Sequence, residues 1–512
     1  MSFPEFQHIY HLHFIISPGL ALVVGIAAGL FVLYTLTLAI YSIYFSPLRK
    51  IPGPKLWIAF PILRHLAEFS GNMDRQIRAF HETYGEVVRL ADDEVSFTTA
   101  KAWSDIHGHG HRQLPKVLQF EKDDSQILQS NDFDHARYRK ALSPAFSEKA
   151  LRDQEPLMKV HIDLLIEKLK DVAASESRAD MVQWYNLTTF DLIGDLAFGE
   201  PFRGLIDQKI HHWIANIFLL VKLGPVVRAA RTYPLLTELF GLFLPRDLRQ
   251  SRETQNEFSR SIVTNRIHNE AQHGRGDFMD SMLKHKDDKD ALTFKELVAN
   301  ATVLIIAGSE TTATLLSGVT YWLLKTPLAL KKVTEEVRSQ FQSEQEIDFI
   351  HASSRLPYML ACLDEGLRRY PPVPTGIRRI TLPDGPSIIA GVELPPNTKV
   401  AVHQSAAYWT DRNFYNAKSF HPERWLAPAK EDPASPFYND NRSVLQPFHL
   451  GPRNCIGKNL AYNEMRLILA RILWNFDIEL CAESEGWAER QKSRTLWEKP
   501  PLWCRLKARK VE

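Results

Sequence analysis

An uncharged apolar run near the N-terminus sets the first limit on how this chain can fold. No charged residue occurs between Phe14 and Phe45, and Leu, Ile, Val and Ala predominate there. About 20 apolar residues cross a bilayer as a helix, so the run predicts a transmembrane helix that begins near Pro18 and Gly19. A cleaved signal peptide is the alternative, but the run is longer than a signal h-region and no Lys or Arg precedes it.

The charges that follow this run predict its orientation. The first strong positive charges come directly after it, at Arg49, Lys50 and Lys55. Positive charge collects on the cytoplasmic side of membrane spans, so the remainder of the chain is expected to face the cytosol. The stiff segment Ile51–Pro54 is then a linker, a hinge that orients the body against the membrane, or both.

Composition excludes several classes of protein. The 512 residues are 45% hydrophobic and 24% charged, with a formal net charge of only +2. These values are ordinary for a globular protein and give no case for a nucleic-acid binder or a disordered polyion. The four cysteines form no CxxC pair and follow no regular spacing, so neither a disulfide framework nor a zinc site is indicated.

Hydrophobic periodicity predicts a mainly α fold with small β-sheets. Residues 150–173 carry apolar side chains at helical spacing, and Thr293–Glu296 is a capping box that opens a long apolar helix ending near Leu324. Strand-like pieces are short: Val87–Leu90, Val95–Thr99, Ser387–Ile389 and Lys399–Val402. We therefore expect a membrane anchor in residues 1–50 and one helix-rich domain in residues 51–512.

The segment Phe448–Gly457 contains the most specific pattern, reading FHLGPRNCIG. Glycines permit tight turns and the close approach of a flat cofactor to the backbone. Cys455 lies just before a predicted helix at residues 458–475, where free amides and the helix dipole favour a thiolate. A structural cysteine buried in a turn is the alternative, but it does not account for the Phe, Gly and Arg placed around Cys455.

This segment resembles the haem-binding loop of cytochromes P450, F-x-x-G-x-R-x-C-x-G, and matches it at every fixed position. The resemblance implies a cytochrome P450 fold with thiolate-ligated haem b and Cys455 as the iron ligand. It also implies that Phe448 packs by the sulfur, that Gly457 lies close to the cofactor, and that Arg453 pairs with a haem propionate. Thiolate ligation pushes electron density onto the iron and favours O–O cleavage.

Two further segments resemble the structural network of the same family. Glu365 and Arg368 lie three residues apart on one helix face, where they can pair. Taken alone, such a pair is usually a surface salt bridge. Together with the P-E-R pattern that contains Arg424, it resembles the family's E-x-x-R network and implies a buried structural triad of Glu365, Arg368 and Arg424.

The long apolar helix contains the segment Ala307–Thr312, reading AGSETT. Ala307 and Gly308 leave room for a ligand, and Thr311 can hydrogen-bond one turn back. A helix that needs small residues for packing is the alternative, but that leaves the acid and alcohol unexplained. The segment resembles the family's oxygen-binding motif, which implies that Ala307 adjoins the cofactor and that Glu310 and Thr311 supply protons to dioxygen.

Further propionate ligands are implied by resemblance at two places. Residues 134–146 resemble the helix in which many relatives have W-x-x-x-R; Arg139 occupies the Arg position, whereas the Trp position holds His135. Histidine can also donate to a propionate. Arg378, beyond the E-x-x-R helix, is the other candidate.

The alternating histidines 107, 109 and 111 suggest a metal site, but no carboxylate or cysteine cluster accompanies them, and a loop near the substrate entrance is the favoured interpretation.

The resemblance implies a microsomal monooxygenase of the endoplasmic reticulum membrane, with the catalytic domain in the cytosol. NADPH–cytochrome P450 reductase would supply electrons, and O2 would oxidise an apolar small molecule. The charges of Arg137, Lys140 and Lys458 either form the reductase docking site or are simply solvated surface charges. Phrases such as Leu142–Ser147 and Phe190–Gly199 resemble fungal secondary-metabolism members related to trichothecene-pathway hydroxylases, which implies a terpenoid or polyketide substrate. Substrate contacts are expected from residues 107–125, 205–233, 303–307 and a strand at 373–377. The alternatives are a reductase-independent isomerase and a non-enzymatic membrane haem sensor.

Overall fold

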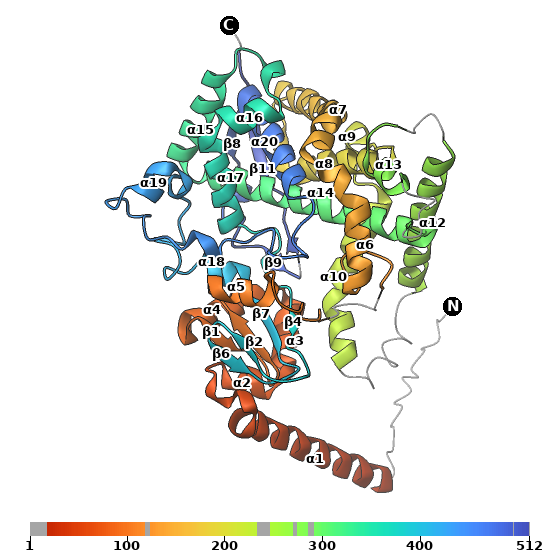
Figure 1. The fold of residues 1–512 in the computed structure, drawn as a ribbon, viewed down its shortest axis with the longest axis vertical. Helices are drawn as coiled ribbons and strands as arrows, with labels where there is room; N and C mark the ends of the chain where they lie inside the picture. Colours follow the sequence, from red (N-terminus) through yellow and green to blue (C-terminus); the bar gives the residue numbers. More distant parts are fainter. Residues whose placement is uncertain are drawn as a thin grey trace, which may run out of the picture.

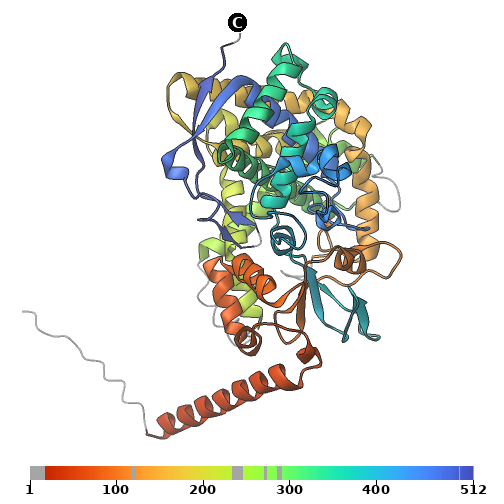
Figure 2. The ribbon, with the colours of Figure 1, turned by 90° about the vertical axis from the view of Figure 1, so that its left-hand side faces the viewer.

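The computed structural model shows a mainly helical body from which one N-terminal helix projects (Figure 1). It describes residues 18–117, 123–232, 246–269, 274–284, 291–494 and 496–510. The projecting helix α1 (Pro18–Ile40) leads into a π-helical turn at Tyr41–Phe45 and points away from the body (Figure 2). The apolar window Gly25–Phe45 is only 6% buried. This helix is therefore a candidate membrane anchor, in agreement with the sequence prediction.

The linker after the anchor is attached to the body. The backbone N–H of Arg89 donates to Pro52 O at 2.8 Å, and the Arg89 guanidinium reaches back to Ser42 O at 2.8 Å. A Cβ atom on Gly53 would lie 2.1 Å from Arg89 O, so glycine is required for this close approach. The segment Ile51–Pro54 thus fixes where helix α1 leaves the body.

The helices of the described chain form most of the body. In chain order after α1 they are α2 (Lys55–Ala59), α3 (Pro61–Ser70), α4 (Met73–Tyr84), α5 (Ala100–His107), α6 (Asp132–Leu142), α7 (Glu148–Ala174), α8 (Met181–Phe198), α9 (Gly204–Asp207), α10 (His212–Thr232), α12 (Arg246–His268), α13 (Phe278–Leu283), α14 (Phe294–Leu324), α15 (Pro327–Gln340), α16 (Phe349–Arg355), α17 (Pro357–Arg369), α18 (Gln404–Tyr408), α19 (Ala427–Glu431) and α20 (Lys458–Asn475).

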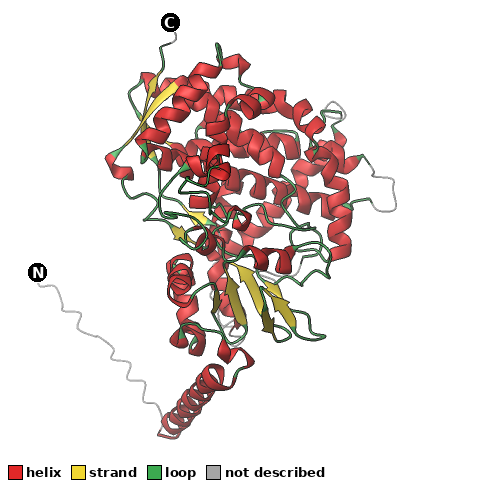
Figure 3. Cartoon of the chain, turned by 60° about the vertical axis from the view of Figure 1, so that its left-hand side comes forward, coloured by secondary structure: helices red, strands yellow, loops and turns green. Residues whose placement is uncertain are grey.

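The strands form small separate sheets (Figure 3). The strands are β1 (Val87–Arg89), β2 (Glu94–Phe97), β3 (Arg178–Asp180), β4 (Arg379–Ile380), β5 (Ser387–Ile389), β6 (Val392–Leu394), β7 (Lys399–Val402), β8 (Phe476–Leu480), β9 (Lys492–Ser493), β10 (Trp497–Glu498) and β11 (Trp503–Ala508). The largest sheet has the order β1-β2-β7-β4, with β2 and β7 parallel and the other pairs antiparallel. The others are β3-β11-β8, β5-β6 and β10-β9.

Helix α14 runs through the middle of the helical part and organises the core (Figure 1). Its N-terminus has the expected capping box, because the Thr293 hydroxyl accepts from Glu296 N and the Glu296 carboxylate accepts from Thr293 N. The helix packs against α8, α17 and α20. It is long and apolar enough to span a membrane, but its apolar window is 67% buried inside the body, as is typical of a core helix.

One predicted element is wrong. Residues 373–377 are irregular, and the strand β4 begins only at Arg379. Pro374 lacks an N–H for sheet pairing, and its carbonyl accepts instead from Ser405 N at 3.1 Å. A Cβ atom on Gly376 would lie 2.5 Å from Val402 O, so only glycine fits where the chain passes β7. The strands β5 and β7 and helix α20 have the predicted bounds.

Candidate active site

The cysteine loop is held in shape by its own backbone and by helix α5. His449 and Gly451 have positive φ angles of 60° and 76°. A Cβ atom on Gly451 would lie 1.7 Å from His107 O, so no other residue fits there. The loop closes through Cys455 N, which donates to Phe448 O at 2.9 Å. This geometry presents Cys455 two residues before Gly457, the N-cap of α20.

Cys455 lies deep in the protein, yet its side chain is exposed because it faces an internal cavity. Burial raises the pKa of the Cys455 thiol, while a hydrogen bond from Gly457 N and the charges of Arg139 and Lys458 act in the opposite direction. A cation bound at the sulfur would be a further and stronger cause of deprotonation. The sulfur is therefore placed as a metal ligand would be, at the start of a helix and open to the cavity.

The cavity measures about 290 Å³ and its walls are mainly apolar. That volume is near the lower end of the range for small-molecule sites. Helix α14 supplies one wall, and the cysteine loop together with the first turns of α20 supplies another; the main lining residues of these two walls are Val303, Leu304, Ala307, Gly308, Thr311, Phe448, Cys455, Gly457 and Leu460. Apolar walls beside an open cysteine sulfur are the surroundings that the haem implied by the sequence requires.

Three predicted cofactor-binding side chains, His135, Arg139 and Arg453, line this cavity. Arg453 donates through Nη2 to Ser130 O at 3.0 Å and to Asp132 Oδ1 at 2.6 Å. Its Nη1 atom is buried and has no hydrogen-bond partner. Burial and the charge of Arg453 lower the pKa of His135 to about 4. This side of the cavity is thus rich in donors and can accept an anionic group.

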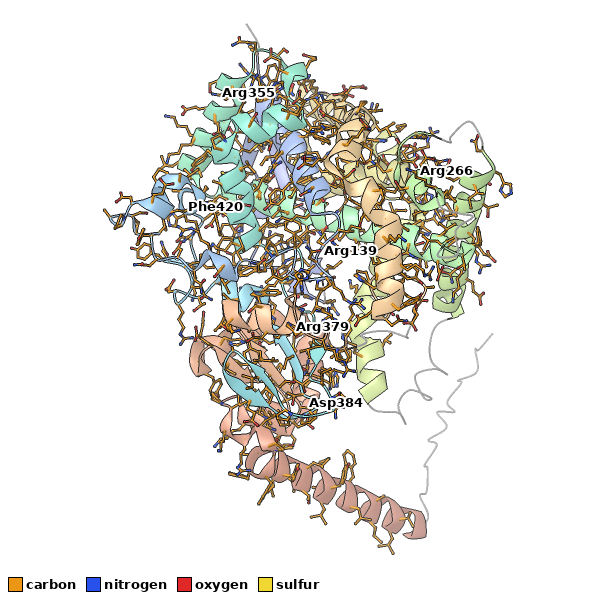
Figure 4. The ribbon with its side chains drawn as sticks, in the orientation of Figure 1. Arg139, Arg266, Arg355, Arg379, Asp384 and Phe420 are labelled. Atoms are coloured by element: carbon orange, nitrogen blue, oxygen red, sulfur yellow. The ribbon has the colours of Figure 1, made fainter. Side chains whose placement is uncertain are left out.

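Three side chains that the sequence did not single out enlarge this basic edge. Lys116 and His449 line the cavity, and Arg379 lies beside them. Burial and the charges of Arg453 and Arg379 lower the pKa of Lys116 to about 7. Arg379 Nε and His449 Nε2 are buried without hydrogen-bond partners. Figure 4 shows Arg139 on α6 and Arg379 at the edge of the sheet, so separate elements contribute to this edge. Donors left unpaired at the edge of an apolar cavity fit the two propionates of haem.

Arg378 requires a correction, because the structure does not bring it to this cavity. Its Nη1 atom lies 3.3 Å from Glu94 Oε2. Glu94 also accepts two hydrogen bonds from Arg64, and the three side chains line a separate pocket. Successive residues of an extended chain point to opposite sides, so the neighbouring Arg379 takes the position expected of Arg378.

Arg139 has a second role beside the cavity. It donates to Asn454 O at 2.7 Å and to Asn454 Oδ1 at 2.5 Å. These bonds tie helix α6 to the residue that precedes Cys455. Arg139 therefore braces the cysteine loop as well as contributing positive charge.

The two predicted oxygen-activation residues, Glu310 and Thr311, do not both face the cavity. Ala307 and Thr311 line the cavity, and Thr311 Oγ1 donates to Ala307 O at 2.6 Å. Glu310 is not among the lining residues; its buried carboxylate is paired with Lys499. The alcohol thus faces the cavity directly, whereas the acid can reach it only through intervening groups.

Glu365, Arg368 and Arg424 form the buried cluster that the motifs predicted. Arg368 donates to both oxygens of Glu365, at 2.9 and 2.6 Å, and Arg424 Nε lies 3.1 Å from Glu365 Oε2. All three side chains are 0% exposed. Burial alone would raise the pKa of Glu365, but the two guanidinium groups lower it overall. Sequence reasoning missed two members: Asp440, which pairs with Arg424, and Trp425, whose indole N–H donates to Glu365 at 2.9 Å.

The expected substrate-contact regions contribute unequally. Val303, Leu304, Val373 and Ile377 line the cavity as predicted. From residues 107–125, Lys116 is the contributor among those described, and residues 118–122 lie outside the described chain. No residue of the described stretch 205–232 lines the cavity, and Tyr233 also lies outside the described residues.

The alternating histidines lie against the cysteine loop. His107 is buried at the end of α5, with its ring centroid 4.8 Å from that of His449. His109 and His111 are exposed. Within the described residues no cluster of three potential metal ligands occurs. His107 is therefore a packing residue behind the cysteine loop.

Glu464 on α20 is a cavity residue that no motif pointed to. Its side chain is buried, and neither carboxyl oxygen has a hydrogen-bond partner that meets ordinary distance and angle limits. Burial raises the pKa of Glu464 from 4.5 to about 8, although the nearby Thr312 hydroxyl acts in the opposite direction. Glu464 is therefore a neutral acid at pH 7, beside the cavity.

A pH dependence of stability follows from this shift. Since the folded state holds the Glu464 proton more tightly than the unfolded state, the group stabilises the fold below pH about 4.5 and this contribution is lost as the pH rises through about 8. We expect the unfolding free energy of wild type, relative to Glu464→Gln, to fall by on the order of 3–5 kcal/mol across that window. Urea unfolding at several pH values measures this. Glu335→Gln, at an exposed carboxylate on α15, is the control; curves for Glu464→Gln and wild type that stay parallel would contradict the prediction.

The fold and the cavity together define a class, namely a mainly helical protein in which a cysteine sulfur faces a pocket that fits haem. The family model for cytochrome P450 matches residues 51–505. Trichothecene C-4 hydroxylase of Trichoderma arundinaceum is 52% identical over 467 residues, covering 91% of this chain and 93% of that relative. A cytochrome P450 monooxygenase of Penicillium canescens is 51% identical over 478 residues, covering 93% and 97%. Averantin hydroxylase of Dothistroma septosporum is 42% identical over 490 residues, covering 94% and 91%.

The chain therefore belongs to the cytochrome P450 family. It is a haem-dependent monooxygenase that hydroxylates small molecules, using O2 and a redox partner as the family does. The relatives are named as monooxygenases and hydroxylases, which does not favour an isomerase or a non-enzymatic sensor.

Proposed function

We propose that Cys455 ligates the iron of haem b in the cavity between α14 and α20. The observation that carries the proposal is the Cys455 sulfur, which faces an apolar cavity with unpaired cationic donors at one edge. When bound, the haem would supply the iron centre at which dioxygen is reduced and cleaved.

Different residues of the chain bind different parts of this cofactor. His135, Arg139 and Arg453 hold the propionates, assisted by Arg379 and Lys116. Phe448 and Gly457 border the sulfur, and Phe448 is fixed by its ring contact with Tyr462 at 5.4 Å. Ala307 leaves space on the opposite wall. The Glu365, Arg368 and Arg424 cluster holds the surrounding backbone in place and does no chemistry.

The chain's proton chemistry is assigned to Glu310 and Thr311. The Thr311 hydroxyl faces the cavity and can hold a water molecule or a proton there. Glu310, the adjacent acid, would exchange protons with that hydroxyl through ordered water. The apolar walls limit access of other water and so restrict protons to this route.

Electrons are proposed to come from NADPH–cytochrome P450 reductase, which docks on the face near the N-terminus of α20. Lys458 is exposed there, and Lys140 lies exposed on α6. Arg137 is withdrawn from the docking surface, because it pairs with Glu296 at 2.5 Å and with Asp134 at 3.2 Å. Positive charge beside the cysteine loop suits an acidic partner.

We further propose that residues 1–50 anchor the enzyme in the endoplasmic reticulum membrane and that residues 51–512 form the cytosolic haem domain. The exposed apolar helix α1 and the positive charges that follow it support this orientation.

The substrate is proposed to be an apolar terpenoid or polyketide intermediate of fungal secondary metabolism, hydroxylated or epoxidised. The apolar cavity walls and a relative named for trichothecene hydroxylation support this class.

The proposed chemistry is tested with Thr311→Ala. Wild type with reductase and NADPH should form product that carries one oxygen atom from labelled dioxygen. Thr311→Ala should form this product roughly 10- to 100-fold more slowly, because a positioned proton donor is lost, and should release more hydrogen peroxide per NADPH consumed.

The matched control is Thr302→Ala on the same helix. Thr302 Oγ1 donates to Val298 O at 2.8 Å, the same type of bond as Thr311 makes, but Thr302 does not line the cavity. It should leave the ratio of product to peroxide unchanged. Equal ratios for Thr311→Ala and wild type would remove Thr311 from the proton route, and wild type without labelled product would refute the monooxygenase assignment.

A further inference from the structure

Lys499 reaches the centre of helix α14 from the C-terminal end of the chain. It lies in the connection between β10 and β11, and its ammonium pairs with Glu310, 189 residues away in the sequence. Both side chains are only 4% exposed. Lys499 Nζ also donates to Thr314 Oγ1 at 2.7 Å, and the Thr314 hydroxyl lies 3.3 Å from Glu310 Oε1. The three side chains thus form a closed buried cluster.

Within this cluster only one oxygen of the Glu310 carboxylate accepts hydrogen bonds. Oε1 accepts from Lys499 and Thr314, whereas Oε2 is buried without a partner. A buried carboxylate is costly unless its charge is compensated, and Lys499 supplies that compensation. One oxygen is therefore fixed and the other is left for water, next to the residue whose hydroxyl faces the cavity.

Residues on both sides of Lys499 hold its backbone segment in place. The Trp497 ring stacks on Tyr370 with centroids 5.1 Å apart, and its indole N–H donates to Pro371 O at 2.8 Å. Glu498 pairs with Lys222 of α10 at 2.7 Å. Pro500 and Pro501 follow directly and restrict the backbone. Such anchoring gives the Lys499 ammonium a defined position.

We propose that Lys499 is the positioning residue for Glu310: it compensates the buried carboxylate, fixes Oε1 and leaves Oε2 to exchange protons with water on the way to Thr311. The proposal rests on the proton-delivery role proposed for Glu310 and Thr311. Lys499 itself is not among the residues that line the cavity.

The test compares Lys499→Met and Lys499→Arg with wild type, each normalised to bound haem. Lys499→Met should lower product formation about tenfold at saturating substrate and raise the peroxide fraction, with KM changed less than about threefold. Lys499→Arg retains the charge and should recover most of the coupling. Because proton delivery is affected, the product fraction in Lys499→Met should also depend more steeply on pH. Lys325→Met, at a partly exposed pair with Glu485 at the end of α14, is the matched control and should behave as wild type.

A second readout does not depend on activity. In urea unfolding, Lys499→Met should lower the midpoint because it leaves Glu310 uncompensated, and Lys499→Met combined with Glu310→Gln should recover most of that loss. Additive midpoint shifts together with an unchanged product-to-peroxide ratio would overturn the proposal. If wild type forms no oxidised product, the proposed function fails instead, and the unfolding comparison still decides whether Lys499 compensates Glu310.

Discussion

Cys455→Ala should abolish the red-shifted Soret band that reduced wild type shows with carbon monoxide, and product formation should fall to background. The thiolate is the feature that gives the iron its electron density, and alanine offers no atom that could replace it. The loop itself should survive, because its closure uses the backbone N–H of residue 455 and not the side chain. Difference spectra of membranes that contain wild type or variant, together with haem content, measure the effect.

Cys481→Ala is the matched control for this experiment. Cys481 is buried at the end of β8 and does not line the cavity. It should retain the full band. A Cys455→Ala protein that still shows the band at full haem loading would disprove the ligand assignment, and the proposed chemistry would fail with it.

Arg368→Met should destabilise the fold by about 3–5 kcal/mol, because it leaves Glu365 charged and buried without its main partner. The change also removes donors from the carbonyls of Tyr408, Ala417 and Ser419, which Arg368 contacts at 2.7–2.9 Å. Domains have only about 5–15 kcal/mol of stability, so much of the variant should lose its haem-binding fold. Urea unfolding and haem content measure the loss.

Two further variants keep this prediction testable even if Arg368→Met does not accumulate. Arg368→Lys keeps the charge but not the planar fork, so it should be intermediate in stability. Lys149→Met removes an exposed pair with Asp153, in which Lys149 is 83% exposed, and should cost less than about 1 kcal/mol. If the Arg368 variants are as stable as Lys149→Met, the cluster is not needed for the fold.

The motifs predicted the chemistry of the site because each is a local rule. The cysteine loop needs Gly451 where its backbone meets His107, and the α20 N-terminus must follow Cys455 directly. The positive φ of Gly451 and the position of the helix start are both properties of a segment of about ten residues, although the contact with His107 is long-range. For the same reason the Thr293 capping box and the bounds of α20 could be predicted from short patterns.

The prediction failed where the outcome depended on distant packing. Arg378 and Arg379 are chemically equivalent neighbours, and the placement of β4 beside β7 decides which one lies next to the basic edge of the cavity. Only the packing of α6 against α14 shows that Arg137 pairs with Glu296. The segment 373–377 is irregular, and the Pro374 carbonyl accepts from Ser405 N and not from a neighbouring strand.

The sequence by itself determined the candidate membrane anchor, the mainly helical fold, the cysteine expected to bind iron and the Glu365–Arg368–Arg424 cluster. Each of these depends on residue type and short-range spacing, which are visible along the chain. Only the tertiary structure decided that Glu310 points away from the cavity towards Lys499. It also decided that Lys116 and Arg379 join the basic edge of the cavity and that Glu464 is a buried acid beside the cavity. Those outcomes arise from contacts between segments tens to hundreds of residues apart, where burial and the choice of ion-pair partner depend on how the helices and sheets pack.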